Sequence, residues 1–231
     1  FEHVVSCLCE CEAKARQELD EKMQREEAQR QLYQRKSVGL RERRFWEWKF
    51  ENDNGRNQKI MIARQYVENW PDMKRKNVGL LLMGPVGTGK SFFAGCIANA
   101  LLEQGERVMM TNFSRILNEM TSYQADKNQI IQNLVDYPLL IIDDLGIERN
   151  SEFALEQVYN VIDSRYCIML PLIVTTNLGL AEMKAADLDI AHQRIYSRIL
   201  EMCVPIYCGG EDRRKEEGTE KLVQVQNLIT G

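Results

Sequence analysis

Apolar runs, each ended by a turn signal, divide most of the chain into alternating strands and helices. Continuous apolar runs are typical of strands buried on both faces of a parallel sheet. Strands are predicted at 78–83, 107–111, 139–142, 172–177 and 204–207. Helices are predicted between them at 92–104, at 112–120, at 128–135, at 151–166 and at 189–202. This alternation predicts one α/β core.

A charged segment precedes these elements. Residues 12–36 contain no Gly or Pro, and pairs such as Glu18 with Lys22 stand four residues apart in the favourable order. A long exposed helix is therefore predicted. Its apolar seam, which includes Leu19 and Met23, is thin. We favour a solvated helix, and a helix that docks onto a partner stays open.

Residues 40–57 are predicted to be a linker, because Ser37 and Gly39 are expected to end the charged helix. The linker mixes arginines with aromatic residues, a combination on which single-stranded nucleic acid can stack. We favour the alternative, in which the aromatic side chains cover the neighbouring domain. A further helix is predicted at 59–70, ending before Pro71, and the basic run 74–76 is expected to be a solvated loop.

The first core strand ends in GPVGTGKS, which has the spacing of a phosphate-binding loop. Glycines let successive backbone N–H groups point at phosphate oxygens. Lys90 supplies a positive charge, and Ser91 offers a hydroxyl to Mg²⁺ at the start of a helix. The predicted ATP-binding residues are Gly84, Pro85, Val86, Gly87, Thr88, Gly89, Lys90, Ser91 and Phe92.

Polar residues also follow two later strands. The run 139–142 ends in Asp143 and Asp144, and the run 172–176 ends in Asn177. The carboxyl ends of parallel strands meet at the edge of the sheet where ligands bind. Asp143 is predicted to hold Mg²⁺, Asp144 to orient or deprotonate an attacking water, and Asn177 to reach the γ-phosphate or that water.

The predicted helix 189–202 carries two arginines beside its apolar stripe. Arg194 and Arg198 stand four residues apart and are not needed by the core. They form either a solvated face or a pair that reaches the nucleotide of a neighbouring subunit and stabilises transition-state charge.

Composition excludes several classes. The net charge is −4 and the pI about 5.5, so any nucleic-acid contact must come from a local basic surface. No apolar run approaches the roughly 20 residues of a membrane span, and a cytoplasmic protein with no membrane association is expected. Cys96, Cys167 and Cys203 are expected to act as small hydrophobes, without a disulfide framework.

The chain begins without methionine, and we expect it to be a fragment. Cys7, Cys9 and Cys11 alternate near its start. Either they belong to a Zn²⁺ module whose other ligands lie upstream, or they are incidental thiols. A complete tetrahedral site needs four ligands, so no closed zinc site is expected in this chain.

The ordered set GPVGTGKS, LLIIDD, VTTN and RIYSR resembles the AAA+ ATPases, and within them the DnaC-type helicase loaders and the related IstB transposition helpers. The resemblance implies a three-layer P-loop NTPase sandwich with a five-stranded parallel sheet in the order 5-1-4-3-2, preceded by a helical N-terminal extension. It implies an N-terminal cysteine-bearing, helicase-binding segment at 1–44, an AAA+ domain at 45–214 and a tail at 215–231.

The resemblance also implies roles for single residues. Lys90 and Ser91 are placed in the Walker A motif, and Asp143 and Asp144 in the Walker B motif. The remaining roles are sensor 1 for Asn177, the arginine finger for Arg198 with Arg194 as its companion, and the terminal arginine for Arg213 or Arg214. Segment 112–135 is expected to hold the helical insertion used against single-stranded DNA. Slow hydrolysis is expected, because many relatives have Glu at the position of Asp144.

The predicted function is an ATP-dependent, Mg²⁺-requiring loader that places a replicative helicase on single-stranded DNA and assembles into a ring or spiral. One alternative is a transposition helper ATPase that binds duplex DNA and a transposase. Another is a nucleotide-sensing adaptor with little hydrolysis.

Overall fold

The structure is a computed structural model that describes residues 10–53, 55, 59–122, 126–146, 151–210, 212, 225 and 229. Some predictions concern parts of the chain outside this description. They are the thiols of Cys7, Cys9 and Cys11, the terminal arginine at Arg213 or Arg214, and most of the tail 215–231.

A five-stranded parallel sheet forms the centre of the molecule. Its strands are β1 (Gly79–Met83), β2 (Val108–Thr111), β3 (Leu139–Leu145), β4 (Leu172–Thr176) and β5 (Cys203–Tyr207). They lie in the order β2-β3-β4-β1-β5, and every neighbouring pair is parallel. The predicted order is therefore confirmed, read from the opposite edge. β1, which leads into the glycine-rich loop, lies between β4 and β5.

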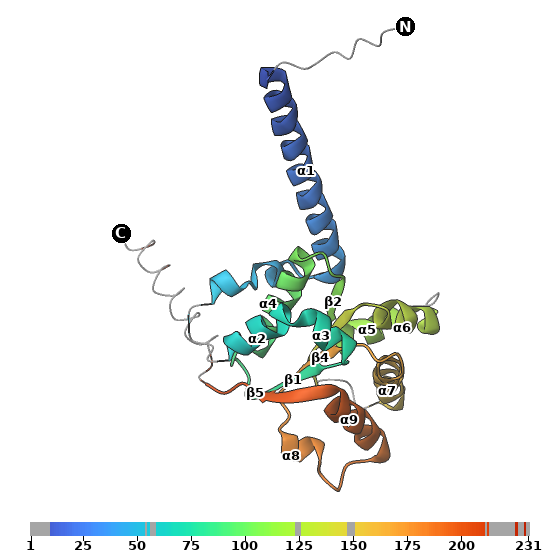
Figure 1. Ribbon diagram of the computed structural model, residues 1–231. Coiled ribbons are helices and arrows are strands. Elements are labelled where there is room, and N and C mark those ends of the chain that lie inside the picture. The colour runs from blue at the N-terminus through green and yellow to red at the C-terminus, as the bar shows by residue number, and fades with distance from the viewer. Residues whose placement is uncertain are drawn as a thin grey trace.

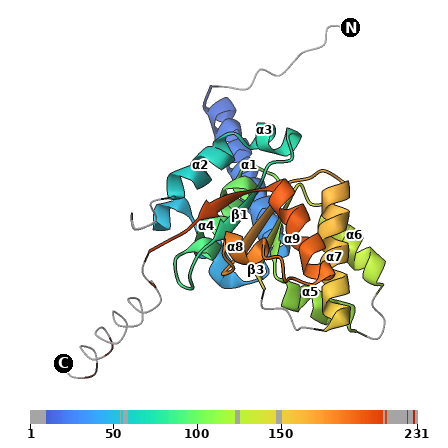
Figure 2. The same cartoon turned by 90° about the horizontal axis from the view of Figure 1, so that it is seen from below.

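Helices cover both faces of the sheet, giving three layers (Figures 1 and 2). One apolar core packs under α2 (Ile60–Glu68), α3 (Trp70–Arg75) and α4 (Lys90–Glu103). The other core packs under the helices of the opposite face. These are α5 (Phe113–Met120), α6 (Lys127–Val135), α7 (Glu152–Cys167), α8 (Leu180–Met183) and α9 (Ile190–Met202).

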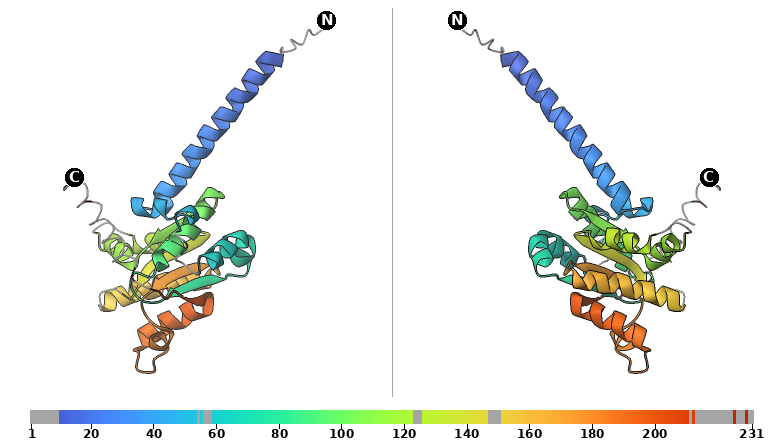
Figure 3. Two further views of the ribbon diagram at one scale, coloured as in Figure 1. Left: turned by 90° about the vertical axis from the view of Figure 1, so that its left-hand side faces the viewer. Right: turned by 90° about the vertical axis from the view of Figure 1, so that its right-hand side faces the viewer.

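Helix α1 (Glu10–Gly39) projects away from these layers (Figures 1 and 3). Within the described part of the chain, α1 is attached to the domain at its C-terminal end. Arg35 donates to the Leu102 carbonyl at the end of α4 at 3.2 Å, and the buried Lys36 pairs with Glu103 at 2.9 Å. The sequence predicts that Ser37 and Gly39 end this helix. The helix continues past Ser37, because its last turn packs on the domain, and it ends at Gly39. A Cβ on Gly39 would lie 2.1 Å from the Val108 carbonyl oxygen.

The linker after α1 folds onto the side of α4. It contains two short 3₁₀ helices, η1 (Arg43–Glu47) and η2 (Phe50–Asn52). Phe45 is buried, and the three other aromatic residues pack partly buried against the same core. Asn99 of α4 donates to the carbonyl oxygens of Phe45 at 2.7 Å and Trp48 at 3.0 Å. The aromatic side chains of the linker thus cover the domain, which confirms the favoured interpretation.

Three local predictions were wrong. The helix predicted at 59–70 is two helices, and Pro71 lies in the first turn of α3 instead of beyond a helix end. Proline is tolerated there because its missing N–H has no intrahelical partner in any case. Lys74 and Arg75 form the last turn of α3 instead of a loop. Cys167 is exposed instead of apolar in its surroundings, whereas Cys96 and Cys203 are buried.

Candidate nucleotide-binding site

The glycine-rich loop joins β1 to α4 at the C-terminal edge of the sheet. Gly84, Gly87 and Gly89 have φ of 146°, 81° and 87°, a region that residues with a Cβ rarely enter. α4 begins directly at Lys90. Glycine suits all three positions because it adopts such angles without the steric cost that a Cβ would add.

Lys90 connects this loop to the neighbouring strand. Its side chain is buried, and Nζ donates to the carbonyl oxygens of Gly84 at 2.8 Å and Pro85 at 2.7 Å. Nζ also donates to Asn177 Oδ1, just beyond β4, at 2.8 Å. The ammonium is therefore held between the start of the loop and the end of β4. An anion bound to the loop amides would lie close to it.

The remaining loop residues divide into inner and outer ones. Thr88 is buried, and its hydroxyl donates to the Pro85 carbonyl at 2.9 Å. Val86 is exposed at the tip. Ser91 and Phe92, in the first turn of α4, are half-buried, and the Phe92 ring lies 6.5 Å from the Trp48 ring of the linker.

The two predicted acidic residues lie at the end of β3, which continues through both of them. Asp143 is buried, and its Oδ1 accepts a hydrogen bond from the Thr175 hydroxyl at 2.7 Å. Asp144 is exposed and has φ of 67°, a left-handed conformation. Asn177 Nδ2 lies 3.4 Å from Asp144 Oδ1, at the long end of hydrogen bonding. The structure thus brings Lys90, Asp143, Asp144 and Asn177 together.

The chemistry of this set fits Mg²⁺ and a nucleoside triphosphate. The loop brings positive-φ glycines, a buried ammonium and a helix N-terminus close together, a combination that favours phosphate. Oxygen ligands at the adjoining strand end suit a hard divalent cation. Ser91 and Asp143 would hold that cation, as the sequence predicts.

A third segment, which no sequence motif predicts, approaches the loop. The Cys208 amide donates to the Met83 carbonyl at 2.6 Å, extending the contact of β5 with β1. A Cβ on Gly87 would lie 1.8 Å from Asp212 Oδ1. The chain after β5 therefore places a carboxylate against the phosphate loop. Asp212 lies beyond any strand or helix motif, so no sequence pattern could place it there.

The predicted arginine pair lies on α9, and its two members differ. Arg198 pairs with Asp163 of α7 through Nε at 2.6 Å and donates to the Tyr159 hydroxyl at 3.0 Å. Its guanidinium also lies over the rings of Tyr159 and Tyr166. Arg194 is exposed and lines a cavity of about 280 Å³ between α7 and α9. Arg198 is thus bound to its own α7, and the structure does not bring either arginine to the Lys90 loop of the same chain.

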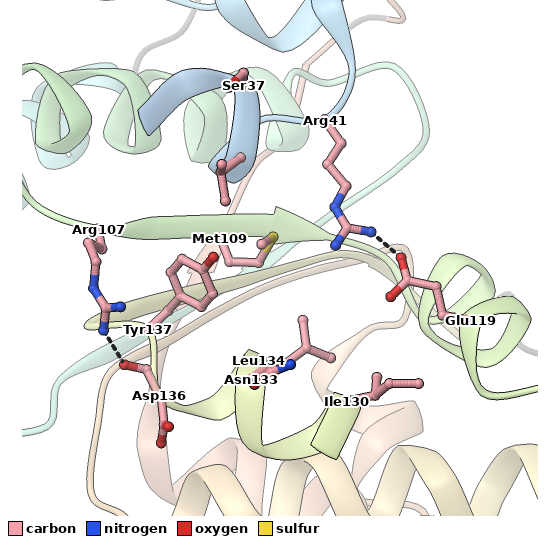
Figure 4. A pocket seen from close by; sticks show the side chains of 11 residues that line it. Ser37, Arg41, Arg107, Met109, Glu119, Ile130, Asn133, Leu134, Asp136 and Tyr137 are labelled. Atoms are coloured by element: carbon pink, nitrogen blue, oxygen red, sulfur yellow. Dashed lines mark hydrogen bonds and ion pairs between the residues drawn. The ribbon is translucent and has the colours of Figure 1, made fainter. Parts of the chain in front are cut away.

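A larger cavity, of about 570 Å³, lies beside β2, the strand at one edge of the sheet (Figure 4). It is framed by the end of α1, by β2 and by the segment 112–137. Arg41 pairs with Glu119 across it, and Arg107 donates to the Asp136 carbonyl at 3.1 Å. Both arginines are engaged with the protein, so this groove is not a ready anion site.

Among the described residues, no group of three or more His, Cys, Asp or Glu side chains is arranged to hold a metal ion. The zinc prediction stays untested, because Cys7 and Cys9 lie outside those residues and only the backbone of Cys11 is described, in the first turn of α1. In the same part of the chain, no helix combines the length and apolar character needed to cross a membrane.

Comparison with known proteins gives a consistent pattern. The family model described as IstB-like ATP binding protein matches residues 9–221. The replicative helicase loader DnaC of Escherichia coli K12 is 27% identical over 133 residues, 56% of this chain and 53% of the relative. A putative ATP-binding protein in an insertion sequence of Mycobacterium tuberculosis is 30% identical over 100 residues, 42% of this chain and 40% of the relative.

The fold recurs in solved structures. A crystal structure of DnaI superposes with a TM-score of 0.62 at 23% identity, covering 76% of this chain and 95% of that chain. The chain spans about half the length of the curated relatives it matches.

Proposed function

Because the chain belongs to the IstB-like ATP-binding proteins, with the AAA+ fold of DnaC and DnaI, we propose that it is an ATPase that loads a replicative DNA helicase onto single-stranded DNA. The observation that carries the ATPase part is the contact of Lys90 with Asn177 beside Asp144. It joins the phosphate loop, the β4 end and the β3 end in one constellation.

Each residue of this constellation has a proposed task. Lys90 binds the β- and γ-phosphates, and the loop amides orient them. Asp144 orients the attacking water and accepts its proton, while Asn177 fixes the position of that water. Mg²⁺, held by Ser91 and Asp143, neutralises phosphate charge when it is bound. The side chain of Asp144 is one methylene shorter than that of glutamate, and this supports the proposal of slow turnover.

The arginines of α9 are proposed to act on a neighbouring subunit. Arg198 is too firmly held by Asp163 and Tyr159 to swing freely, so it would act from a fixed position on the α7–α9 face. Arg194, exposed on the same face, accompanies it. Assembly into a ring or spiral is the arrangement in which this face meets another chain's phosphate loop.

The macromolecular partners are proposed from the relatives and from exposed elements. The names of two curated relatives describe replicative helicase loaders. Helix α1 stands clear of the domain along most of its length, with Leu19 and Met23 exposed, and is the element proposed to contact the helicase. The segment 112–135 is proposed to contact single-stranded DNA.

A transposition helper is the second candidate. It is favoured by the family's description and by the relative from an insertion sequence. Such a protein would bind duplex DNA and a transposase. The nucleotide-sensing adaptor is the third candidate, and it differs from both in having no productive turnover.

ATP hydrolysis at several protein concentrations, alone, with single-stranded DNA and with duplex DNA, tests these proposals. A loader is expected to show turnover that rises more than linearly with concentration and to prefer single-stranded DNA. Arg198→Ala should abolish this turnover without lowering ATP affinity, because the arginine would act on a neighbouring subunit's nucleotide. Preference for duplex DNA would favour the transposition helper, and ATP binding without turnover would favour the adaptor.

A further inference from the structure

Strand β3 contains an irregularity at the two acidic residues. Ile142 pairs with Val174 and Leu145 pairs with Thr176, so Asp143 and Asp144 together lie opposite Thr175 alone. This arrangement of two residues against one is a β-bulge, which bends the strand and redirects side chains. Without it, two successive residues of a strand would point to opposite faces of the sheet.

Thr175 of β4 lies directly opposite the bulge. Its side chain is buried, with 1% of its surface exposed. The hydroxyl donates to Asp143 Oδ1 at 2.7 Å and accepts from the backbone amide of Asp144 at 2.8 Å. One hydroxyl therefore fixes the carboxylate of the first acidic residue and the backbone of the second.

The second of these bonds holds an unfavourable conformation. Asp144 has φ of 67°, and a residue with a Cβ stays in this region only when surrounding contacts determine it. The hydrogen bond to Thr175 is such a contact. In this conformation Asp143 is buried while Asp144 remains exposed beside Asn177.

We propose that Thr175 is a positioning residue, whose hydroxyl sets both members of the acidic pair for Mg²⁺-dependent ATP hydrolysis. This inference rests on the proposed ATPase function. A hydroxyl is required because the position needs a donor and an acceptor on one small atom. Valine has the same shape and neither group, and serine keeps both.

The experiment compares Thr175→Val with Thr175→Ser in the full chain. Thr176→Val is the matched control, since Thr176 is equally buried and its hydroxyl also bonds to β3, at the Leu145 carbonyl, without touching either Asp. Thr175→Ala serves as a second hydroxyl-free variant. Three quantities are measured: deuterium exchange of the Asp144 amide, affinity for a fluorescent ATP analogue with and without Mg²⁺, and kcat with KM for ATP.

Both hydroxyl-free variants should exchange the Asp144 amide about tenfold faster or more, since its acceptor is gone. The gain in nucleotide affinity on adding Mg²⁺ and the value of kcat should each fall about tenfold or more, as for other groups that orient a metal ligand. Thr175→Ser should restore all three quantities to within about threefold, and Thr176→Val should leave the Mg²⁺ dependence unchanged.

Unchanged exchange, Mg²⁺ dependence and kcat in folded Thr175→Val and Thr175→Ala would overturn the proposal while leaving the ATPase function intact. An equal loss in Thr176→Val would also overturn it, since the effect would then come from weakened packing of β4. A parent chain that binds no ATP would instead overturn the proposed function itself.

Discussion

The ammonium of Lys90 donates a hydrogen bond to the side-chain oxygen of Asn177, and 87 residues separate the two in the chain. This contact ties the phosphate loop to the end of β4.

The two residues should therefore separate binding from turnover. Lys90→Ala removes charge-assisted bonds to phosphate and should weaken ATP binding about a hundredfold. Asn177→Ala should leave affinity within about threefold and lower kcat about a hundredfold, the usual effect of losing one positioned polar group. Equilibrium titration with steady-state kinetics measures both.

Asn133→Ala, on the exposed face of α6, is the control for this pair. It should change neither quantity. Equal losses of affinity in Lys90→Ala and Asn177→Ala would contradict the division of roles, because both residues would then act in binding.

Arg165 should be among the strongest single contributors to stability. It is fully buried on α7 and donates to the carbonyl oxygens of Val135, Tyr137, Pro138 and Pro171. Burial lowers the pKa of its guanidinium to about 9. Arg165→Met would leave these four carbonyl oxygens without their donor and should lower the free energy of unfolding by about 3 kcal/mol or more.

Denaturant unfolding checks this prediction. Arg165→Lys should also destabilise, since an ammonium cannot reproduce the planar fork that reaches four carbonyls. Arg107→Met is the control, because the exposed Arg107 makes one bond to a carbonyl in the same region and should contribute about 0.5 kcal/mol or less. Similar losses for Arg107 and Arg165 would show that burial is not the cause.

Gly95 of α4 should resist replacement by alanine. In an exposed helix the change would stabilise by up to about 1 kcal/mol. Here the added Cβ would lie 2.5 Å from a ring carbon of Trp48. The clash should dominate and destabilise by about 1–3 kcal/mol, as overpacking does.

A double-mutant cycle with Trp48→Ala tests this explanation. Removing the ring makes room for the methyl group, so Gly95→Ala should cost less in the Trp48→Ala background than in the parent. Additive losses in urea unfolding would mean that the clash is relieved elsewhere and that the linker does not constrain α4.

Asp189 should give a pH-dependent contribution to stability. It caps α9, accepting from the His192 amide at 2.9 Å, and this bond lowers the pKa of its carboxyl below the usual value. The folded state therefore favours the ionised form. The stabilisation is fully present above the ordinary pKa of aspartate, about 3.9, and is lost as the pH falls through the lower folded value.

The melting temperature of Asp189→Ala should accordingly lie below that of the parent at pH 6 and approach it in acid. Asp187→Ala, an exposed carboxylate two residues earlier, should show no comparable difference. A gap between parent and Asp189→Ala that widens in acid would contradict the assigned direction.

The sheet order and the Lys90 loop could be predicted because they depend on local signals. Apolar runs reveal buried parallel strands, and the glycine spacing reveals backbone angles. Asp143, Asp144 and Asn177 follow such runs, so their meeting at one edge was also predictable. These elements lie where expected.

Other features depend on contacts that no local pattern encodes. The bulge opposite Thr175 is a matter of register between two strands, and Thr175 alone looks like any β-branched strand residue. Asp163 and Arg198 lie on separate helices, so their pairing follows only from the packing of α7 on α9. Likewise, a proline at position 71 is compatible both with the end of one helix and with the first turn of the next.

Helix α1 extends far from the domain to which its C-terminal end is attached. Its 30 residues extend about 45 Å at 1.5 Å per residue. Its C-terminal end is attached both to the end of α4, whose other end carries Lys90, and to β2, where Gly39 packs against Val108. The far tip of α1 therefore lies about 45 Å from this attachment, so a partner bound there would be held away from the nucleotide site.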